Sequence, residues 1–383
     1  MDWQVELVAI PAPPYGEQAR ARWLAARFAE AGLSNVHTDA AGNVLGILSA
    51  RKLPPESTGP LVLLSAHLDT VFPPGTALHP VLEGGRLRAP GACDNGAGVT
   101  GMLAVVHALV DCGVELPAPL ALLGNVGEEG EGDLRGVRHF YEHDALAGRV
   151  AAHIVLDGAG TDAAVTQALG SLRYRVTVTG PGGHSFTDAG TPNPIAALAS
   201  ALARLAETTL PEKPRTTLNL GTIRGGISVN SIPESAQATV DFRSTDRKQL
   251  ARLEAELESA VGDAAERCNA KAKAAGAASR GALSFTISRI GDRPAANLAE
   301  DSPLLAALRA VDRHLGLRTD LRLGSTDANI PLSLGVSALA MGAGGEGGAA
   351  HTLHEWYSPR DRELGLKRVL LLTLAMLEWA AEQ

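Results

Sequence analysis

Hydrophobic residues along the chain gather in short, uninterrupted runs that end in polar side chains. Leu61–Pro73, with the sequence LVLLSAHLDTVFP, places four apolar residues before a small-residue pair and then presents His67 and Asp69 ahead of a proline-broken loop. Such a run predicts a buried strand with polar groups at its carboxyl end. In an open α/β sheet that end lines the crevice where ligands bind, so we expect the chemistry of the protein to lie there.

The same arrangement recurs twice further along the chain. Pro119–Gly124 predicts a short apolar strand that leads into Gly127–Gly136, a stretch crowded with glycine and carboxylate residues. His153–Leu156 predicts another strand, which ends directly before Asp157. Strands that alternate with helical stretches and deliver polar groups to one edge are typical of a doubly wound α/β fold.

The remaining periodic segments supply the helices that such a fold requires. Gly96–Asp111 is apolar nearly all round, which predicts a helix buried on most sides with Asp94 at the mouth of its N-terminus. Helical or alternating patterns and flanking glycine and proline residues predict further elements. These are helices at Glu17–Ala31, Ser302–Leu315 and Asp361–Ala381, strands at Asn43–Leu48 and Ser337–Met341, and loops at Pro54–Pro60 and Gly324–Asn329.

The pattern changes between residues 170 and 290. Leu172–Thr179 and Ala236–Arg243 alternate polar and apolar residues, as strands with one solvent-facing side do. Helices are predicted at Pro194–Ala206 and Lys248–Ala275, and strands near Thr217–Gly221 and Leu283–Ser288. The resulting order, β-α-β-β-α-β, is typical of a ferredoxin-like domain. We therefore expect an α/β protein in which a doubly wound α/β/α domain, residues 1–169 and 291–383, carries an inserted α+β domain of residues 170–290.

Composition and charge exclude some classes of partner. A length of 383 residues with 45% apolar and 20% charged residues suits two globular domains. The net charge of −8, with no cluster of Lys and Arg, argues against nucleic acid or an anionic membrane as a partner, because both need a basic surface. No stretch approaches the roughly 20 apolar residues of a membrane-spanning helix.

The cysteines and the first residues bear on the cellular compartment. Cys93, Cys112 and Cys268 are odd in number and widely spaced, which argues against a disulfide framework or a cysteine metal cage and favours a reducing compartment. The opening MDWQVELVAI lacks the basic-then-apolar layout of a secretory signal. We therefore expect a cytoplasmic protein.

Carboxylate and imidazole side chains collect at the ends of the predicted strands. They are His67, Asp69, Asp94, Glu128, Glu129, Asp157 and a late histidine, either His351 or His354. Taken alone, Asp94 suits a helix N-cap, and Glu128 with Glu129 suits a solvated acidic turn. As a joint set without cysteine they favour hydrolytic zinc, cobalt or manganese over structural zinc. The set exceeds the needs of one ion, so we expect two.

An ordered series of short motifs runs through essentially the whole chain. The motifs are SAHLDTV at 65–71, GACDNGAG at 91–98, GEEGEGDLRG at 127–136, LDG at 156–158, GGHS at 182–185, NSIP at 230–233, FR at 242–243, GSTDAN at 324–329 and HTLHE at 351–355. Together they resemble the dizinc hydrolase family that includes tripeptidase (peptidase T), glutamate carboxypeptidase, succinyl-diaminopimelate desuccinylase and acetylornithine deacetylase. GEEGEGDLRG and GSTDAN look most like the tripeptidase-like branch. The family also has an inserted lid and dimerisation domain, in keeping with the change of pattern at 170–290.

The resemblance implies a role for each of the metal-binding candidates. It makes Asp94 the carboxylate that bridges two metal ions. His67 and Asp157 would complete one site, and the other would be completed by Glu129 with His351. Zinc is the expected metal, with cobalt or manganese as alternatives.

Catalytic roles are implied for the neighbours of these ligands. Glu128 becomes the general base, since a carboxylate that is not a ligand can take a proton from water and pass it to the leaving amine. Asp69 would interact with the imidazole of His67, two residues before it, and so fix the tautomer of that ring. The family pattern places a glutamate four residues after the late histidine, which His351 and Glu355 fit, and it leaves His354 as the alternative ligand.

Substrate-binding roles follow mainly from the inserted domain. The resemblance assigns His184 to stabilising the tetrahedral oxyanion, often from the other subunit of a dimer. It assigns Asn230 and Arg243 to the carboxylate end of the substrate, which the planar guanidinium can meet with two parallel hydrogen bonds. Ser325 and Thr326 of the GSTDAN stretch are further candidates for contact with the substrate.

The expected function is therefore metal-dependent hydrolysis of an amide bond in a small peptide that has a free carboxylate, by a homodimer joined through residues 170–290. An N-acyl-amino-acid deacylase or a carboxypeptidase is the alternative among enzymes. A catalytically silent binding protein on the same scaffold is the alternative from another class. The retention of Glu128 together with every metal-binding candidate argues against that last alternative.

Overall fold

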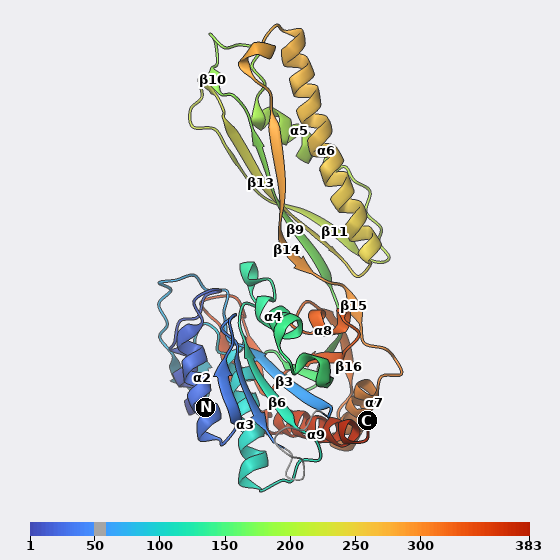
Figure 1. Ribbon diagram of the computed structural model, residues 1–383. Coiled ribbons are helices and arrows are strands. Elements are labelled where there is room, and N and C mark those ends of the chain that lie inside the picture. Colours follow the sequence, from blue (N-terminus) through green and yellow to red (C-terminus); the bar gives the residue numbers. More distant parts are fainter. Residues whose placement is uncertain (50–58) are drawn as a thin grey trace. The chain divides into compact units, whose positions relative to one another are not determined.

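The computed structural model describes residues 1–49 and 59–383, so most of the expected loop Pro54–Pro60 lies outside the described residues. The chain divides into two compact units, residues 1–168 with 296–383, and residues 169–295 (Figure 1). We expected the inserted unit to end near residue 290. It extends further because its last strand, β14 (Ser284–Arg293), continues beyond Ser288.

Among the described residues, a sheet of nine strands forms the centre of the first unit. In spatial order they are β1 (Ser34–Thr38), β2 (Val44–Leu48), β6 (Leu120–Asn125), β3 (Leu61–His67), β7 (Val150–Leu156), β17 (Ser337–Met341), β8 (Ala163–Ala168) and β15 (Ala296–Asn297), with β16 (Asp320–Gly324) also paired to β8. Neighbours among β6, β3, β7 and β17 are parallel. The carboxyl ends of these four strands therefore share one edge of the sheet.

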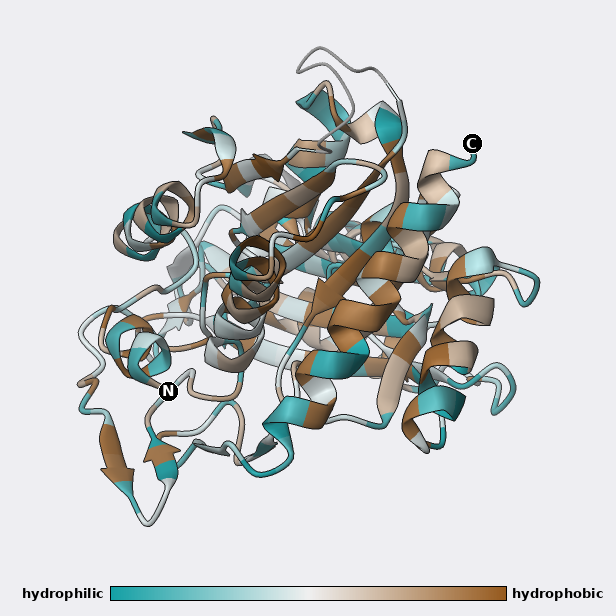
Figure 2. Ribbon diagram, turned by 90° about the horizontal axis from the view of Figure 1, so that it is seen from below, coloured by the Kyte–Doolittle hydropathy of each residue, from teal (hydrophilic) through white to brown (hydrophobic). Residues whose placement is uncertain are grey.

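Helices cover both faces of this sheet. Even-numbered residues of β3, such as Val62 and Leu64, pack in the largest hydrophobic cluster, and odd-numbered residues, such as Leu61 and Leu63, pack in another on the opposite face. The first face is covered by α2 (Gln18–Glu30), α3 (Gly96–Asp111), α7 (Pro303–Leu315) and α9 (Arg362–Ala381), and the second by α4 (Arg135–His143). This confirms the predicted α/β/α layering, and Figure 2 shows the central strands hydrophobic over most of their length. Within the described ranges no helix is both long and apolar enough to cross a bilayer.

Several short elements of the first unit carry too little periodicity to be predicted. They are α1 (Asp2–Val8), α8 (Asn329–Ser333), the 3-10 turns η1 (Gly130–Gly132) and η2 (Ala147–Arg149), and a four-stranded sheet of β18 (Glu346–Gly348), β19 (Trp356–Ser358), β5 (Arg86–Arg88) and β4 (Val81–Glu83). The pairing of β19 with β5 matters for function. It brings the chain that follows His351 alongside the chain that precedes Asp94.

The second unit is an antiparallel sheet with two helices. Its strands lie in the order β11 (Thr216–Gly225), β13 (Ser235–Ser244), β9 (Gly170–Thr179) and β14. The helices α5 (Pro194–Ala206) and α6 (Arg247–Ala274) pack on this sheet in one hydrophobic cluster. A small ribbon of β10 (Gly183–His184) with β12 (Ser231–Ile232) and the turn η3 (Ala278–Arg280) complete the unit. The predicted β-α-β-β-α-β order is confirmed.

Candidate metal centre

Three neighbouring parallel strands deliver polar side chains to one edge of the central sheet. His67 is the last residue of β3 and lies beside Asn125, the last residue of β6. Asp157 directly follows β7, which pairs with the other side of β3. The side chains expected to act together are therefore brought together by the register of the strands, as the runs of apolar residues predicted.

Asp94 reaches the same edge from the turn before α3. The residue that caps this helix is Asn95, whose side-chain oxygen accepts the backbone N–H of Gly98 at 3.1 Å, so the alternative of Asp94 as the N-cap is wrong. The Asn95 amide also donates to the carbonyl of Leu156 at 2.9 Å. This bond holds the start of α3 against the end of β7, and the Asp94 carboxylate is left to face the other donors.

The late histidine that meets these carboxylates is His351. Its Nε2 lies 3.0 Å from Asp94 Oδ2 and 3.0 Å from Glu129 Oε1. The backbone of His351 has φ of +64°, a left-handed conformation that residues other than glycine seldom adopt and that is found more often at functional sites. His354 is exposed, and among the described residues the groups of converging donor atoms contain His351 and not His354.

Five of the side chains form two sets of three donors that share one member. In each set, one potential ligand atom from each residue lies within 4.8 Å of the others. The sets are His67, Asp94 and Asp157, and Asp94, Glu129 and His351. Asp94 thus lies between two positions that a divalent ion can occupy. A further set, His67 with Glu128 and Glu129, lies in the same place.

The electrostatics of the donors fit the binding of cations. Burial alone would raise the pKa of Asp94, but hydrogen bonds from His351 and His67 hold this pKa well below its ordinary value. The bond to Asp94 in turn raises the pKa of His351 to about 9. Asp94 Oδ1 is buried, and His67 Nε2 lies 3.1 Å from it. Carboxylates that converge in this way, with imidazoles as their neighbours, match the donor chemistry of a dinuclear zinc, cobalt or manganese site.

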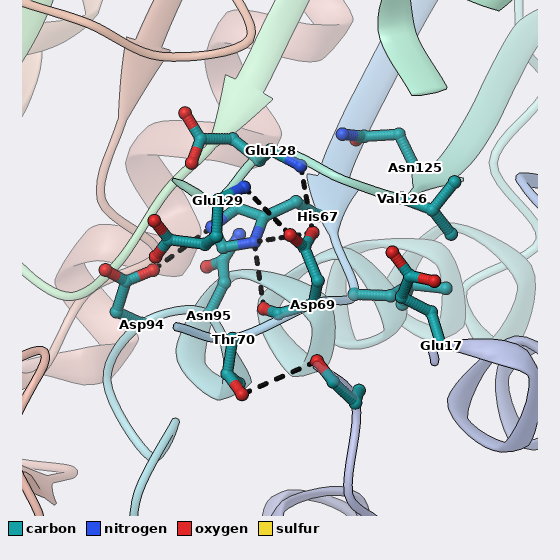
Figure 3. Close-up of polar contacts among 12 residues, drawn as sticks. Glu17, His67, Asp69, Thr70, Asp94, Asn95, Asn125, Val126, Glu128 and Glu129 are labelled. Carbon is teal, nitrogen blue, oxygen red and sulfur yellow. Dashed lines mark hydrogen bonds and ion pairs between the residues drawn. The ribbon is translucent and has the colours of Figure 1, made fainter. Parts of the chain in front are cut away.

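Asp69 supports both His67 and the pair of glutamates. Its two carboxylate oxygens accept the backbone N–H groups of Glu128 at 3.0 Å and Glu129 at 2.8 Å (Figure 3). Nδ1 of His67 lies 3.2 Å from the Asp69 carbonyl oxygen and 3.6 Å from Oδ1. A proton on Nδ1 therefore faces Asp69, which leaves Nε2 directed at Asp94 and Asp157.

The two adjacent glutamates point in different directions. Figure 3 shows the Glu129 carboxylate turned toward Asp94 and the Glu128 carboxylate turned away from it. Both side chains are buried. One glutamate is therefore placed to hold metal, while its neighbour keeps a carboxylate beside the same position.

Glu355 has a role that sequence reasoning missed. Its side chain is fully buried, and its carboxylate accepts the backbone N–H groups of Gly91, Cys93 and Asp94, each at 2.8 Å. Burial raises the pKa of Glu355 above its ordinary value. The sequence pattern places Glu355 four residues after His351. That spacing was the one available signal, because the partners are more than 260 residues away.

The GSTDAN stretch connects β16 to α8, and its one acidic residue, Asp327, is fully buried. Asn125 donates to Asp327 Oδ2 at 2.6 Å, and burial raises the pKa of Asp327 to about 7. No sequence pattern assigned a role to this aspartate. Of the two substrate-binding candidates, Thr326 is buried and its hydroxyl accepts the N–H of Ala328, whereas Ser325 is half-buried.

Comparison with known proteins identifies the family. The model of peptidase family M20/M25/M40 matches residues 63–375, most of the chain. The chain belongs to this peptidase family. The description of the family is that of peptidases, and the converging donors of this chain agree with metal binding.

Individual relatives of this M20-family chain are more distant. A probable carboxypeptidase from Neosartorya fischeri is 32% identical over 210 residues, which are 49% of this chain and 46% of that protein. The match thus spans about half the length of each. A tripeptidase from Staphylococcus aureus has a TM-score of 0.76 at 20% identity, covering 100% of this chain and 98% of that chain. A dinuclear metal binding peptidase from Bacillus subtilis has a TM-score of 0.66 at 14% identity, covering 98% and 97%. The two structures establish a common fold with M20 peptidases.

In the inserted unit of this M20-family chain, His184 and Asn230 lie together. The N–H of Ser185, next to His184, donates to the Asn230 carbonyl at 3.0 Å, and β10 pairs with β12. The backbone N–H of Phe186 donates to Nδ1 of the exposed His184 ring at 3.2 Å. In a neutral ring the proton must then reside on Nε2, which makes that nitrogen a hydrogen-bond donor.

Arg243 lies at the opposite end of the same unit. It is the penultimate residue of β13, whereas Asn230 precedes the first residue of that strand, Ser235. At roughly 3.4 Å per residue, Ser235 and Arg243 are about 27 Å apart along β13. The guanidinium of Arg243 is paired with Asp241, Nε to Oδ1, at 2.8 Å. The structure therefore brings two of the three expected substrate-binding residues of this unit together and separates the third.

Proposed function

We propose that this member of the M20 family hydrolyses an amide bond in a small peptide with a free carboxylate, using two divalent ions held by its first unit. Zinc is the expected metal. The observation that carries the proposal is the position of Asp94 in both donor sets, with the Glu128 carboxylate close by and turned away from Asp94. His67 and Asp157 would hold one ion with Asp94. Glu129 and His351, the remaining ligands, would hold the second ion.

Different residues of the chain have different roles in the proposed reaction. When bound, the ions supply Lewis-acid polarisation of the scissile carbonyl and lower the pKa of the attacking water. Glu128 accepts a proton from that water as its oxygen bonds to the carbonyl carbon, and Glu128 then donates the proton to the departing nitrogen as the C–N bond breaks. Nε2–H of His184 is a donor for the oxyanion, and Arg243 a partner for the substrate carboxylate.

The distance between these last two groups supports a homodimer. An extended tripeptide is about 10 Å long. A substrate of that size cannot touch residues at both ends of β13, which are separated by more than twice that length. We therefore propose that His184 and Asn230 complete the active site of a second copy of the chain, and that Arg243 serves a different site from the one that they serve.

A substrate panel tests the function. Metal-free protein is reloaded with zinc, cobalt or manganese and assayed with dipeptides, tripeptides and N-acetyl amino acids, and release of each product is followed by mass. We expect metal-dependent cleavage, with tripeptides cleaved best. Preferred cleavage of N-acetyl amino acids would instead identify a deacylase, and release of the C-terminal residue a carboxypeptidase, the activity named for the fungal relative. Full metal loading without turnover of any substrate would favour a binding protein on the same scaffold.

A further inference from the structure

An apolar pocket opens beside the metal centre. It has a volume of about 620 Å³, and its walls come from residues 71–77, which follow β3, and from residues 351–353. The side chains of Val71, Phe72 and Ala77 line it on the first segment. Leu353 lines it on the second and is 63% exposed. The pocket is therefore a concave apolar surface that solvent reaches.

His351 belongs both to this pocket and to the metal centre. Its Nε2 meets Asp94 and Glu129 at 3.0 Å, and the same residue lines the pocket. The opposite wall begins only two residues after Asp69. Because consecutive residues of an extended peptide are spaced by roughly 3.4 Å, a substrate whose scissile bond lies at the metal ligands has a neighbouring side chain within reach of this pocket.

The lining provides no carboxylate, ammonium or guanidinium group to pair with a charged side chain. Among the described residues that line it, His351 is the only ionisable one, and its ring nitrogen is engaged with the carboxylates. The two hydroxyls present are already used: Thr76 donates to the Pro73 carbonyl at 2.7 Å, and Thr352 donates to the Ala349 carbonyl at 2.8 Å. An apolar group is thus the ligand that gains most from entering the pocket.

We propose that this pocket binds an uncharged apolar side chain, such as that of leucine, on the substrate residue next to the scissile amide. The inference rests on the proposed peptidase function and adds the class of side chain that the site selects. Differences of one apolar group in such a pocket change kcat/KM by roughly 10-fold to 200-fold. We expect the lower part of that range, because the pocket is open to solvent on one side.

The first experiment measures selectivity of the zinc-loaded full chain. Tripeptides of glycine are substituted at each position in turn with Leu, Asp or Lys, and kcat/KM is determined for each. At one position flanking the cleaved bond, the Leu peptide is expected to exceed the Asp and Lys peptides by about tenfold or more. The ratio of kcat/KM for Leu to that for Asp at this position is then the quantity that the variants must change.

The second experiment places a charge in the pocket from each wall in turn. In Leu353→Lys and Ala77→Lys, the ratio for Leu to Asp is expected to fall at least tenfold, because an apolar side chain in the pocket would desolvate the new ammonium, whereas a carboxylate is attracted to it. Leu334→Lys is the matched control, since Leu334 is 60% exposed and does not line the pocket. Its ratio should equal that of the wild type. Metal content is measured for each variant. If Leu353→Lys loses metal, Ala77→Lys still tests the pocket, because Ala77 is remote in sequence from His351.

The outcomes separate this inference from the function on which it rests. Metal-dependent peptide cleavage with the same ratio of Leu to Asp in Ala77→Lys as in the wild type would overturn the pocket and leave the proposed function intact. Failure of the wild type to cleave any peptide would overturn both.

Discussion

At the scale of single residues, two imidazoles, those of His67 and His351, face the Asp94 carboxylate. In the proposed metal sites, each imidazole must instead donate a lone pair to a metal ion. His351 shares its Nε2 with Asp94 and Glu129, and hydrogen bonds to carboxylates raise the pKa of His67 despite its burial. A histidine must be neutral to bind a metal ion. Metal binding therefore displaces protons from this site.

This competition predicts a pH dependence of metal affinity. Because the hydrogen bond to Asp94 raises the pKa of His351 to about 9, the affinity of the site that contains His351 should rise with pH and level off above about 9. Titration calorimetry with manganese in buffers of different ionisation enthalpy should detect proton release at pH 7.5, and His351→Ala should release fewer protons. The same pairing stabilises the metal-free fold fully below the ordinary pKa of 6.5, and this contribution is lost as pH rises through about 9. Binding without proton release would contradict the assignment.

The choice between the two late histidines is testable directly. His351→Ala removes a donor that lies 3.0 Å from both Asp94 and Glu129, so we expect loss of one metal ion and of activity. His354→Ala, another exposed position on the same turn, should keep both metals and its turnover. Metal analysis by mass spectrometry decides the matter, and the reverse result would make His354 the ligand.

The role of Glu128 is separable from that of Glu129. Glu128→Gln should retain both ions, because the neighbouring Glu129 faces Asp94, but its turnover should fall by about 10²–10⁴-fold, since an amide cannot carry the proton. Glu131→Gln changes an exposed glutamate of the same loop and serves as the control. Steady-state rates together with metal content test this, and a rate within a few-fold of wild type would refute the role.

At the scale of elements, the turn that carries Asp94 depends on a carboxylate from the far end of the chain. Glu355 accepts three backbone N–H groups of residues 91–94, and the pairing of β19 with β5 brings these two segments together. His351 lies four residues before Glu355. One short segment therefore both supplies a proposed metal ligand and positions the carboxylate that the two donor sets share.

Replacing the Glu355 carboxylate should weaken metal binding more than it destabilises the fold. In Glu355→Gln the amide nitrogen must face one N–H of the turn, which leaves a buried donor unsatisfied at a cost of about 1–3 kcal/mol of unfolding free energy. We expect weaker binding at both sites and an altered visible spectrum of the cobalt-loaded protein. Glu363→Gln, on an exposed part of α9, is the control. An unchanged cobalt spectrum would show that the turn does not need Glu355.

Element by element, the sequence predicted what local patterns encode. Apolar runs ending in His67 and Asp157 identified buried parallel strands, and their shared register made the convergence of these residues predictable. The three-residue strands β4, β5, β18 and β19 were beyond prediction, because a period needs more residues to be visible. Contacts such as Glu355 with residues 91–94, or Asn125 with Asp327, join distant segments and leave no local pattern.

At the scale of the whole molecule, the surface of the inserted unit suits pairing with a second copy. Strand β11 is at one edge of its sheet, and its side chains are mostly exposed, Ile223 among them. Phe186 and Val229, close in sequence to His184 and Asn230, are also strongly exposed. An unpaired edge with apolar neighbours is a surface that proteins usually cover, and a twofold dimer is the commonest way to do so.

Two inactive variants should restore each other's activity if His184 acts across the dimer. His184→Ala lacks the oxyanion donor and Glu128→Gln lacks the base, so each protein alone should be almost inactive. If His184 acts in the site of the partner, a mixed dimer has one site in which both residues are intact. Random exchange makes about half of the dimers mixed, so activity should return to about a quarter of that of the wild type.

A second mixture is the negative control for the recovery of activity. Glu128→Gln with His351→Ala changes two residues of the first unit, so no site of a mixed dimer is complete and no activity should return. Subunit exchange is followed by native mass spectrometry of differently tagged chains. If exchange is complete and the mixture of His184→Ala with Glu128→Gln stays inactive, His184 does not act across the dimer. Since His184 and Arg243 lie at opposite ends of the inserted unit, that result would also remove one of these two residues from the catalytic assignment.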